Sequence, residues 1–277
     1  MNIRDSPARL EMRYDTIIRT FNSEKSLHDV IDSLRRQSLR PSRIIVIDSG
    51  STDSTLKIAA AQGCHIITYE GKVFNYSKSL NQALRLVSSK HFLVLSSHTI
   101  LTDIHLLQDM SLLISGQIPV VSCGRNNVPR SVKTTCEDTF DGFNGIWNCC
   151  ALYRTKLARK IGFNERLPTA EDQYFAAHIY RLGKKTALFE GPCVKHKNDR
   201  YGFKKQRNEY VSIAYYTHRP LMSPGSISNL LRESIEEFIS APGSKQLSYH
   251  KAALAGRLMM AYLLEPRFRS RYFPDNC

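Results

Sequence analysis

The stretch RIIVIDSGSTDST, residues 43–55, decides the fold of this chain. Its first five residues are a short β-branched run, which is typical of a strand buried on both faces of a parallel sheet. The polar turn that follows leads into a helix expected over residues 55–62, which Asp53 or Ser54 can cap and Gly63 can close. A buried strand that passes through a polar turn into a helix is the repeating unit of an α/β fold.

The same alternation continues on both sides of this unit. Apolar runs and amphipathic patterns predict strands at 14–19, 65–68, 92–95, 149–154 and 186–189, and helices at 26–37, 78–88, 155–161 and 171–182. Together they predict an α/β fold with a mostly parallel central sheet. Because ligands of such sheets bind beyond the carboxyl ends of the strands, we expect the chemistry at residues 20–22, 48–53 and 96–98.

The alternation of strand and helix patterns is interrupted after residue 123. Residues 124–145 are polar and aperiodic, and a loop of that length is usually functional or disordered. From about residue 204 the pattern is helical, with helices expected at 204–216, 227–240 and 251–264. We therefore predict a main α/β domain over residues 1–203 and a C-terminal helical extension over residues 204–277.

Composition bounds the class of protein. With 42% hydrophobic residues the chain can form one sizeable core, and it holds no run of the roughly 18 apolar residues that a spanning helix needs. The polar N-terminus does not resemble a secretory signal, so we expect a cytoplasmic protein. Seven cysteines without a Cys-x-x-Cys pair argue against a disulfide scaffold or a structural zinc site. The formal net charge of +14 favours anionic partners without choosing among nucleotides, acidic lipids and nucleic acid.

Five polar residues can carry chemistry, and each also has a structural interpretation. The Asp48 carboxylate can accept hydrogen bonds from a ligand, or it can shape the turn after its strand. Glu171 and Asp172, at a predicted helix start, can include a general base or can only favour the helix dipole. His98 follows a predicted strand, where it lines the ligand edge or packs structurally, and His196 binds a metal or phosphate or is a solvated basic loop residue.

The sequence resembles a family 2 glycosyltransferase with the GT-A fold. Four stretches match in order and spacing, namely residues 17–22, 46–55, 74–81, and 162–165 leading to 171–173. His196, after the strand that follows the acidic helix, matches a further family position. The resemblance spans residues 14 to about 200 and implies a three-layer α/β/α sandwich, with residues 1–203 as the catalytic domain.

The resemblance also implies a reaction and a set of site residues. It implies an inverting transfer of a hexosyl or deoxyhexosyl group from a nucleotide-sugar to a hydroxyl of a glycan or lipid-linked acceptor, in surface polysaccharide biosynthesis. Asp172 matches the base that takes the acceptor proton, and Glu171 is a neighbour that positions or tunes it. The positions that match donor-binding residues are Thr20, Asn22, Asp48, Asp53, Lys78, Asn81, Ser97 and His98.

One motif departs from the family pattern. Where the family has Asp-x-Asp for a divalent cation, this chain has Ser96-Ser97-His98, as in members similar to rhamnosyltransferases. Either His98 and His196 hold a divalent cation such as Mn²⁺ or Mg²⁺, or no metal is needed and His98, Lys78 and Lys195 neutralise the diphosphate. The surplus of positive charge and the lack of carboxylates favour the second alternative.

Acceptor and membrane contacts are expected elsewhere. Trp147 and Asn144 border the polar loop and are expected at the acceptor, although Trp147 can equally be a core tryptophan. The amphipathic helix 251–264 precedes Arg267, Arg269 and Arg271, so it can lie on the anionic inner face of the plasma membrane, or pack on the core or in a homodimer.

Rival classes remain open at this point. A sugar-1-phosphate nucleotidyltransferase needs a glycine-rich loop, and residues 19–25 contain no glycine. A binding module on a degenerate transferase fold is disfavoured because Glu171 and Asp172 are retained. A nucleic-acid binder has only the charge in its favour, so we expect no nucleic-acid partner.

Overall fold

The computed structural model describes residues 12–124, 128–140, 144–167 and 169–196, together with six isolated residues between 228 and 239. The chain divides into two compact units, Met1–Asn164 with Glu171–Asp199, and Glu165–Ala170 with Arg200–Cys277. The account that follows concerns the first unit. The predicted boundary between residues 203 and 204 falls outside the described residues and stays a prediction.

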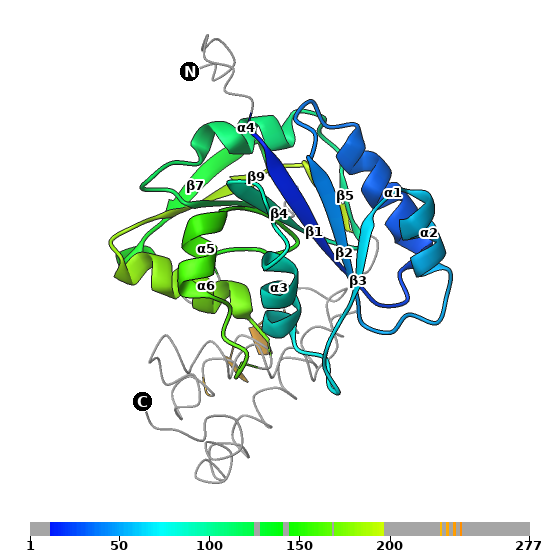
Figure 1. Cartoon of the computed structure of the whole chain (residues 1–277). Coiled ribbons are helices and arrows are strands. Elements are labelled where there is room, and N and C mark those ends of the chain that lie inside the picture. Colours follow the sequence, from blue (N-terminus) through cyan, green and yellow to red (C-terminus); the bar gives the residue numbers. More distant parts are fainter. Residues whose placement is uncertain are drawn as a thin grey trace. The chain divides into compact units, whose positions relative to one another are not determined.

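Eight strands form the central sheet, in the order β3-β2-β1-β4-β8-β6-β9-β7 (Figure 1). All of them except β8 and β7 run in one direction, so the prediction of a mostly parallel sheet is confirmed. A separate antiparallel pair joins β5 to β10. The strands are β1 Tyr14–Thr20, β2 Arg43–Asp48, β3 His65–Thr68, β4 His91–Ser96, β5 Thr99–Leu101, β6 Val120–Cys123, β7 Ser131–Thr135, β8 Cys150–Arg154, β9 Thr186–Glu190 and β10 Val194–His196.

Helices cover both faces of this sheet, because its buried strands alternate apolar side chains toward either side. Ile18 and Val46 pack into a cluster with α1, α2 and α4, whereas Ile17 and Ile47 pack into a second cluster with α3, α5 and α6. The predicted three-layer sandwich is therefore confirmed (Figure 1). The helices are α1 Glu24–Arg35, α2 Thr55–Ala61, α3 Tyr76–Leu84, α4 Leu106–Leu113, α5 Thr155–Ile161 and α6 Glu171–Arg181, with a 3₁₀ turn, η2, at Glu137–Thr139.

Helix α3 begins and ends earlier than its apolar pattern predicts. It begins at Tyr76 because the Asn75 side chain caps it, accepting a hydrogen bond of 2.8 Å from the Lys78 N–H. It ends at Leu84, where tighter turns continue to Val87, which is still buried. The predicted helix 78–88 is thus corrected at both ends.

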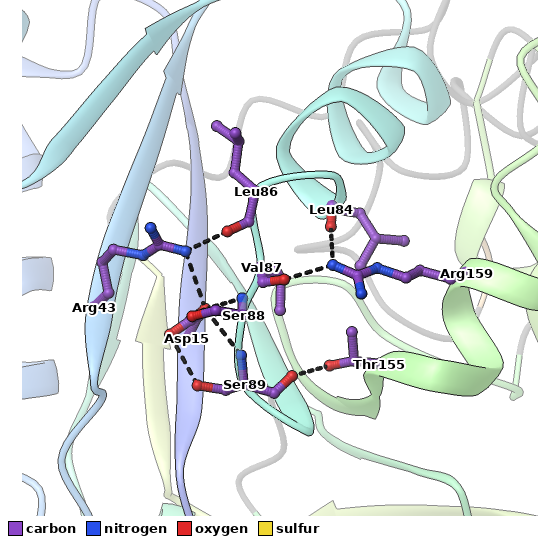
Figure 2. Close-up of polar contacts among 9 residues, drawn as sticks. All are labelled: Asp15, Arg43, Leu84, Leu86, Val87, Ser88, Ser89, Thr155 and Arg159. Atoms are coloured by element: carbon purple, nitrogen blue, oxygen red, sulfur yellow. Dashed lines mark hydrogen bonds and ion pairs between the residues drawn. The ribbon is translucent and has the colours of Figure 1, made fainter.

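A polar network at the amino edge of the sheet fixes the chain beyond α3 (Figure 2). The Asp15 carboxylate, on a residue 1% exposed, accepts hydrogen bonds from the N–H and hydroxyl groups of both Ser88 and Ser89. Arg43 lies 3.3 Å from the same carboxylate. The Arg159 guanidinium donates to the Leu84 and Val87 carbonyls at the end of α3. Its positive charge is stabilising there because the C-terminal end of a helix is partially negative.

Several elements were not predicted from the sequence. Strand β7 lies inside the stretch 124–145 that we expected to be an aperiodic loop. It is an edge strand with mostly exposed side chains, so no apolar alternation marks it. Helix α4 and the short strands β5 and β10 also lacked a clear signal.

The predicted C-terminal helices fall mostly outside the described residues, and 204–216 and 251–264 do so entirely. Within 227–240 the six described residues are helical, namely Ser228, Leu231, Arg232, Ile235, Glu236 and Ile239. Of the helices that the structure describes, none has the length and apolar character required to cross a bilayer.

Candidate active site

The carboxyl edge of the sheet gathers most of the residues predicted to carry chemistry. Thr20 at the end of β1 pairs with Asp48 at the end of β2, and Arg19 pairs with Ser96 at the end of β4. Strand β8 starts at this edge, since the Ser96 N–H donates to the Cys149 carbonyl over 3.0 Å. Parallel strands thus bring distant segments of the sequence to one edge.

Asp48 shapes the turn after β2 with its whole carboxylate. One oxygen accepts hydrogen bonds from the Thr20 hydroxyl at 2.8 Å and the Ser51 hydroxyl at 2.5 Å. The other accepts from the Gly50 and Ser51 N–H groups at 3.0 and 2.8 Å. Gly50 has a φ of 95°, which favours glycine at this point of the turn. Both carboxylate oxygens are therefore engaged within the protein, and contact with a donor stays a prediction.

Asn22 and Asp53 tie the loop after β1 to the loop after β2. The Asn22 side-chain carbonyl accepts from the Thr52 N–H at 2.9 Å. Asp53 accepts from the Thr55 N–H at 2.9 Å and from the Glu24 N–H at 3.1 Å. Asp53, rather than Ser54, thus supplies the side-chain cap of α2. The two loops form one connected surface at the carboxyl edge.

The Ser96-Ser97-His98 segment places hydroxyl and imidazole groups where the family has carboxylates. The Ser97 hydroxyl lies 2.9 Å from the Ser23 hydroxyl. The rings of His98 and His196 lie 5.6 Å apart between centroids, because β5 pairs with β10. Within the described ranges, no group of three His, Cys, Asp or Glu side chains is arranged to hold a metal ion.

Lys78 and Asn81 both lie on α3. Lys78 is in the first turn and is half-buried. The Asn81 amide forms a reciprocal pair with the backbone of Phe163, with distances of 2.8 and 2.9 Å. Asn81 therefore joins α3 to the turn after α5, and a direct contact of its side chain with the diphosphate stays a prediction.

Glu171 and Asp172 begin helix α6, as the sequence predicted. Glu171 is 4% exposed, and one of its oxygens accepts from Arg19 at 2.8 Å and from the Asn148 amide at 3.1 Å. Asp172 is half-buried, and among the described residues it accepts only from backbone N–H groups, those of Asn148 at 3.1 Å and Gln173 at 2.9 Å. Within this part of the chain, the pair thus combines a carboxylate that has a cationic partner with one that has none.

The unequal partners of the two carboxyl groups affect the pKa of Asp172. Burial, together with the adjacent Glu171 charge, raises the pKa of Asp172 to about 7. The two backbone hydrogen bonds and the Arg19 charge oppose this rise. A carboxyl group with a pKa near neutrality can accept and release a proton under physiological conditions.

Asn144 and Trp147 border the end of the polar loop, which packs on α6. A Cβ on Gly145 would lie 2.6 Å from the Ala176 Cβ, so only glycine allows this close approach. The Asn144 amide donates to the Thr139 carbonyl at 2.9 Å. Trp147 is half-buried, and its ring lies 3.1 Å from the position of a Cβ on Gly124. Both residues lie in this docked segment, and their contact with an acceptor stays a prediction.

Sequence reasoning missed three residues of this site: Arg19, Asn148 and Tyr153. The Tyr153 hydroxyl donates to the Asn148 side-chain carbonyl at 2.5 Å. Arg19 did carry a signal, because a cation inside an apolar strand run needs a buried anionic partner. Asn148 and Tyr153 carried none, since neither composition nor spacing distinguishes them.

The fold and this edge define the class of protein. A three-layer α/β/α unit whose mostly parallel strands end beside a carboxylate pair has the architecture of GT-A glycosyltransferases. The family profile described as glycosyl transferase family 2 matches residues 15–189, and the chain belongs to this family. The predicted resemblance is thereby confirmed, and the nucleotidyltransferase and nucleic-acid interpretations are not favoured.

Curated relatives carry related names. O-antigen chain rhamnosyltransferase RfbN of Salmonella typhimurium is 26% identical over 211 residues, which are 68% of this chain and 67% of that protein. Poly(ribitol-phosphate) beta-N-acetylglucosaminyltransferase TarS of Staphylococcus aureus is 25% identical over 83% of this chain and 41% of that protein. The chain thus spans about two thirds of RfbN and less than half of TarS.

A solved structure shares the fold. Mannosyltransferase PcManGT of Pyrobaculum calidifontis, solved with GDP-Man and Mn²⁺, has a TM-score of 0.59 at 14% identity, covering 95% of this chain and 81% of its own. Similarity at this identity supports the GT-A architecture.

Proposed function

We propose that this protein is an inverting glycosyltransferase of surface polysaccharide biosynthesis. It moves a hexosyl or deoxyhexosyl group from a nucleotide-sugar to a hydroxyl of a glycan or lipid-linked acceptor. The names of RfbN and TarS support the acceptor class. The observation that carries the proposal is the Glu171–Asp172 pair, which Arg19 links to the edge where β1 ends.

In the proposed reaction Asp172 is the base. The acceptor oxygen forms a bond to the anomeric carbon while the bond from that carbon to the diphosphate oxygen breaks on the opposite face. The acceptor proton passes to a carboxylate oxygen of Asp172, and the nucleoside diphosphate leaves with the electron pair. A pKa of about 7 supports this role, because a base near ambient pH takes the proton most efficiently.

The donor is proposed to lie over the loops that end β1 and β2. The hydrogen bonds that connect these loops hold their backbone rigidly, which limits the entropy lost on binding. Asn81 is proposed to act through the turn at Phe163 that it fixes. The remaining proposed donor residues are Thr20, Asn22, Asp48, Asp53, Lys78, Ser97 and His98.

The diphosphate charge is proposed to be met without a metal ion. The donor set at Ser96-Ser97-His98 offers hydroxyls and imidazole, whereas Mg²⁺ prefers carboxylate oxygens. His98, Lys78 and the exposed Lys195 are proposed to stabilise the leaving group. If a chelator abolishes transfer and Mn²⁺ restores it, then His98 and His196 hold a cation and this part of the proposal is wrong.

The acceptor is proposed to contact Trp147 and Asn144. The protein is proposed to be cytoplasmic and peripheral on the inner face of the plasma membrane. Its net charge of +14 supports attraction to anionic lipid. Sedimentation with anionic and with zwitterionic vesicles tests this placement, and light scattering tests for a homodimer.

A ligand screen tests the donor assignment. We expect one class among UDP-, GDP- and dTDP-sugars to raise the melting temperature of the full chain, with no added requirement for Mn²⁺. The preferred donor is then incubated with glycan and lipid-linked acceptors, and the anomeric configuration of the product is determined by NMR. Retention of configuration would contradict an inverting transfer, and stabilisation by a duplex oligonucleotide alone would contradict a transferase.

A further inference from the structure

The two carboxyl groups that begin α6 have unequal partners. Glu171 meets a guanidinium from β1, with a side chain 15% exposed for Arg19 and 6% exposed for Glu171. In the part of the chain that the structure describes, Asp172 accepts hydrogen bonds only from the N–H groups of Asn148 and Gln173. Adjacent buried carboxyls cannot easily both be ionised, so their partners decide which one holds the negative charge.

Arg19 is itself held in place. Its Nη1 donates both to Glu171 and to the Tyr76 carbonyl, the latter at 3.3 Å. Its guanidinium carbon lies 5.1 Å from the centroid of the Tyr76 ring, an arrangement that attracts a cation to the ring face. Because an arginine side chain stays protonated in proteins, this positive charge beside Glu171 is permanent.

Asn148 connects the two carboxyl groups. Its side-chain amide donates to Glu171, and its backbone N–H donates to Asp172. Its own carbonyl oxygen is fixed by the Tyr153 hydroxyl from β8. One residue thus sets the spacing of both carboxyls, and its side-chain donor supports only the charge on Glu171.

We propose that Arg19 and Asn148 are positioning residues that localise the negative charge on Glu171 and leave Asp172 as the carboxyl that exchanges the proton. The proposal rests on Asp172 being the base of the proposed function. Among the described residues, the titratable groups that face Asp172 are Glu171 on α6, Arg19 on β1 and Tyr153 on β8. Of these, Arg19 supplies the fixed positive charge, and of the two carboxyl groups it donates its hydrogen bond to Glu171.

The loss of Arg19 should therefore move the proton between the carboxyls. Without the cation, a negative charge on Glu171 would be buried with only the Asn148 amide as a donor, so Glu171 should hold the shared proton more strongly. Asp172, with two backbone N–H donors, should then ionise first. The proton would lie on Glu171, Asp172 would be a weaker base, and transfer would slow.

Carbon NMR of the full chain with labelled Asp and Glu carboxyl groups tests this assignment without any substrate. The resonances are assigned by their loss in Asp172→Asn and Glu171→Gln. In the wild type we expect the Asp172 resonance to titrate near pH 7. In Arg19→Gln we expect the Asp172 midpoint to fall by at least about one pH unit, because the shared proton moves toward Glu171.

Three further variants complete the test. Arg19→Lys keeps the charge and should keep the titration on Asp172. Glu171→Gln removes the neighbouring charge and should lower the Asp172 midpoint, which tests the same coupling if Arg19→Gln does not fold. Arg43→Gln, which disturbs the Arg43–Asp15 pair at the opposite edge, should leave the Asp172 titration unchanged.

Three results would overturn the proposal: an unchanged Asp172 midpoint in Arg19→Gln or Glu171→Gln, loss of the Asp172 titration in Arg19→Lys, or a shifted Asp172 midpoint in Arg43→Gln. None of these measurements depends on turnover. If the titrations behave as expected but Asp172→Asn transfers sugar at the normal rate, the charge arrangement stands and the base assignment fails.

Discussion

Two carboxyl groups at opposite edges of the same sheet, the buried Asp15 and the half-buried Asp172, behave in opposite ways. At the amino edge, Asp15 is enclosed by the Ser88 and Ser89 donors and by Arg43 (Figure 2). Burial alone would raise the pKa of Asp15, but these hydrogen bonds and the Arg43 charge outweigh it and lower the pKa. At the carboxyl edge, burial and the Glu171 charge raise the pKa of Asp172.

The difference shows that burial does not decide what a carboxyl group does. A buried carboxylate whose lone pairs are filled by donors holds the chain together and stays ionised. A carboxyl beside a second carboxylate, with few donors, is poised to exchange a proton. We therefore expect the amino edge to stabilise the fold, and we propose the carboxyl edge as the place for chemistry.

The largest expected effect comes from removing the Asp172 carboxylate. Asp172→Asn should lower kcat by about 10²–10⁴-fold, because a general base contributes about that much. The rate is measured with the donor and acceptor identified by the screen. Asp15→Asn, at equal concentration of folded protein, serves as the control and should keep the wild-type kcat. A normal rate in Asp172→Asn would show that Asp172 is not the base, and the proposed difference in role between Asp172 and Asp15 would be wrong.

The second effect is on stability at the amino edge. Asp15→Ala should lower the free energy of unfolding by about 3 kcal/mol, because the Arg43 charge and four Ser88 and Ser89 donors lose their buried acceptor. Urea denaturation measures the loss. Replacement of the exposed Asp138 by Ala should change stability by less than about 0.5 kcal/mol. A loss in Asp15→Ala as small as this control would show that the network is not stabilising.

The third effect is an opposite dependence of stability on pH. Because the pKa of Asp172 is raised to about 7, the contribution of Asp172 to the free energy of unfolding of the wild type falls as pH rises from about 4 to about 7. Asp172→Asn avoids this cost, so its stability relative to the wild type should rise by about 2 kcal/mol, or roughly 5 °C, between about pH 5 and about pH 8.

Asp15 should show the reverse slope. Its lowered pKa means that its contribution is present above the ordinary Asp value of 3.8 and is lost as pH falls through the lower folded-state pKa. The advantage of the wild type over Asp15→Asn should therefore shrink between about pH 5 and about pH 3. Melting curves of both variants across this range check the two slopes, and parallel pH dependences would contradict the comparison.

The smallest expected effect is at the end of α3. Arg159 donates to the Leu84 and Val87 carbonyls, so Arg159→Met should destabilise the protein by about 1 kcal/mol while keeping the aliphatic part of the side chain. Calorimetry should show a melting temperature lower by roughly 3 °C, with Lys160→Met as the control on the same helix. A loss of kcat without a loss of stability would show that Arg159 serves the reaction rather than the stability of the fold, which would contradict this comparison.

The sequence predicted the inner part of the fold well. Strands β2 and β4 contain continuous apolar runs because both of their faces are covered by helices, and such runs are visible without coordinates. The edge strand β7 and the short strands β5 and β10 escaped prediction. The side chains of β7 and β10 are largely exposed or partly buried, and β5 is only three residues long, so their pairing depends on neighbours that are distant in the sequence.

The residues of the site also divide into those that local sequence patterns predict and those that only long-range contacts bring together. Asp48 and the Glu171–Asp172 pair could be placed from the sequence, because an acidic turn after a buried strand and an acidic helix start are local patterns. By itself the sequence determined the layered fold, the family and these carboxylates. Only the tertiary structure decided that Arg19 from β1 and Asn148 from the turn before β8 contact Glu171, because a charge pair across 152 positions leaves no local pattern, and its energy exists only once folding has removed the intervening water.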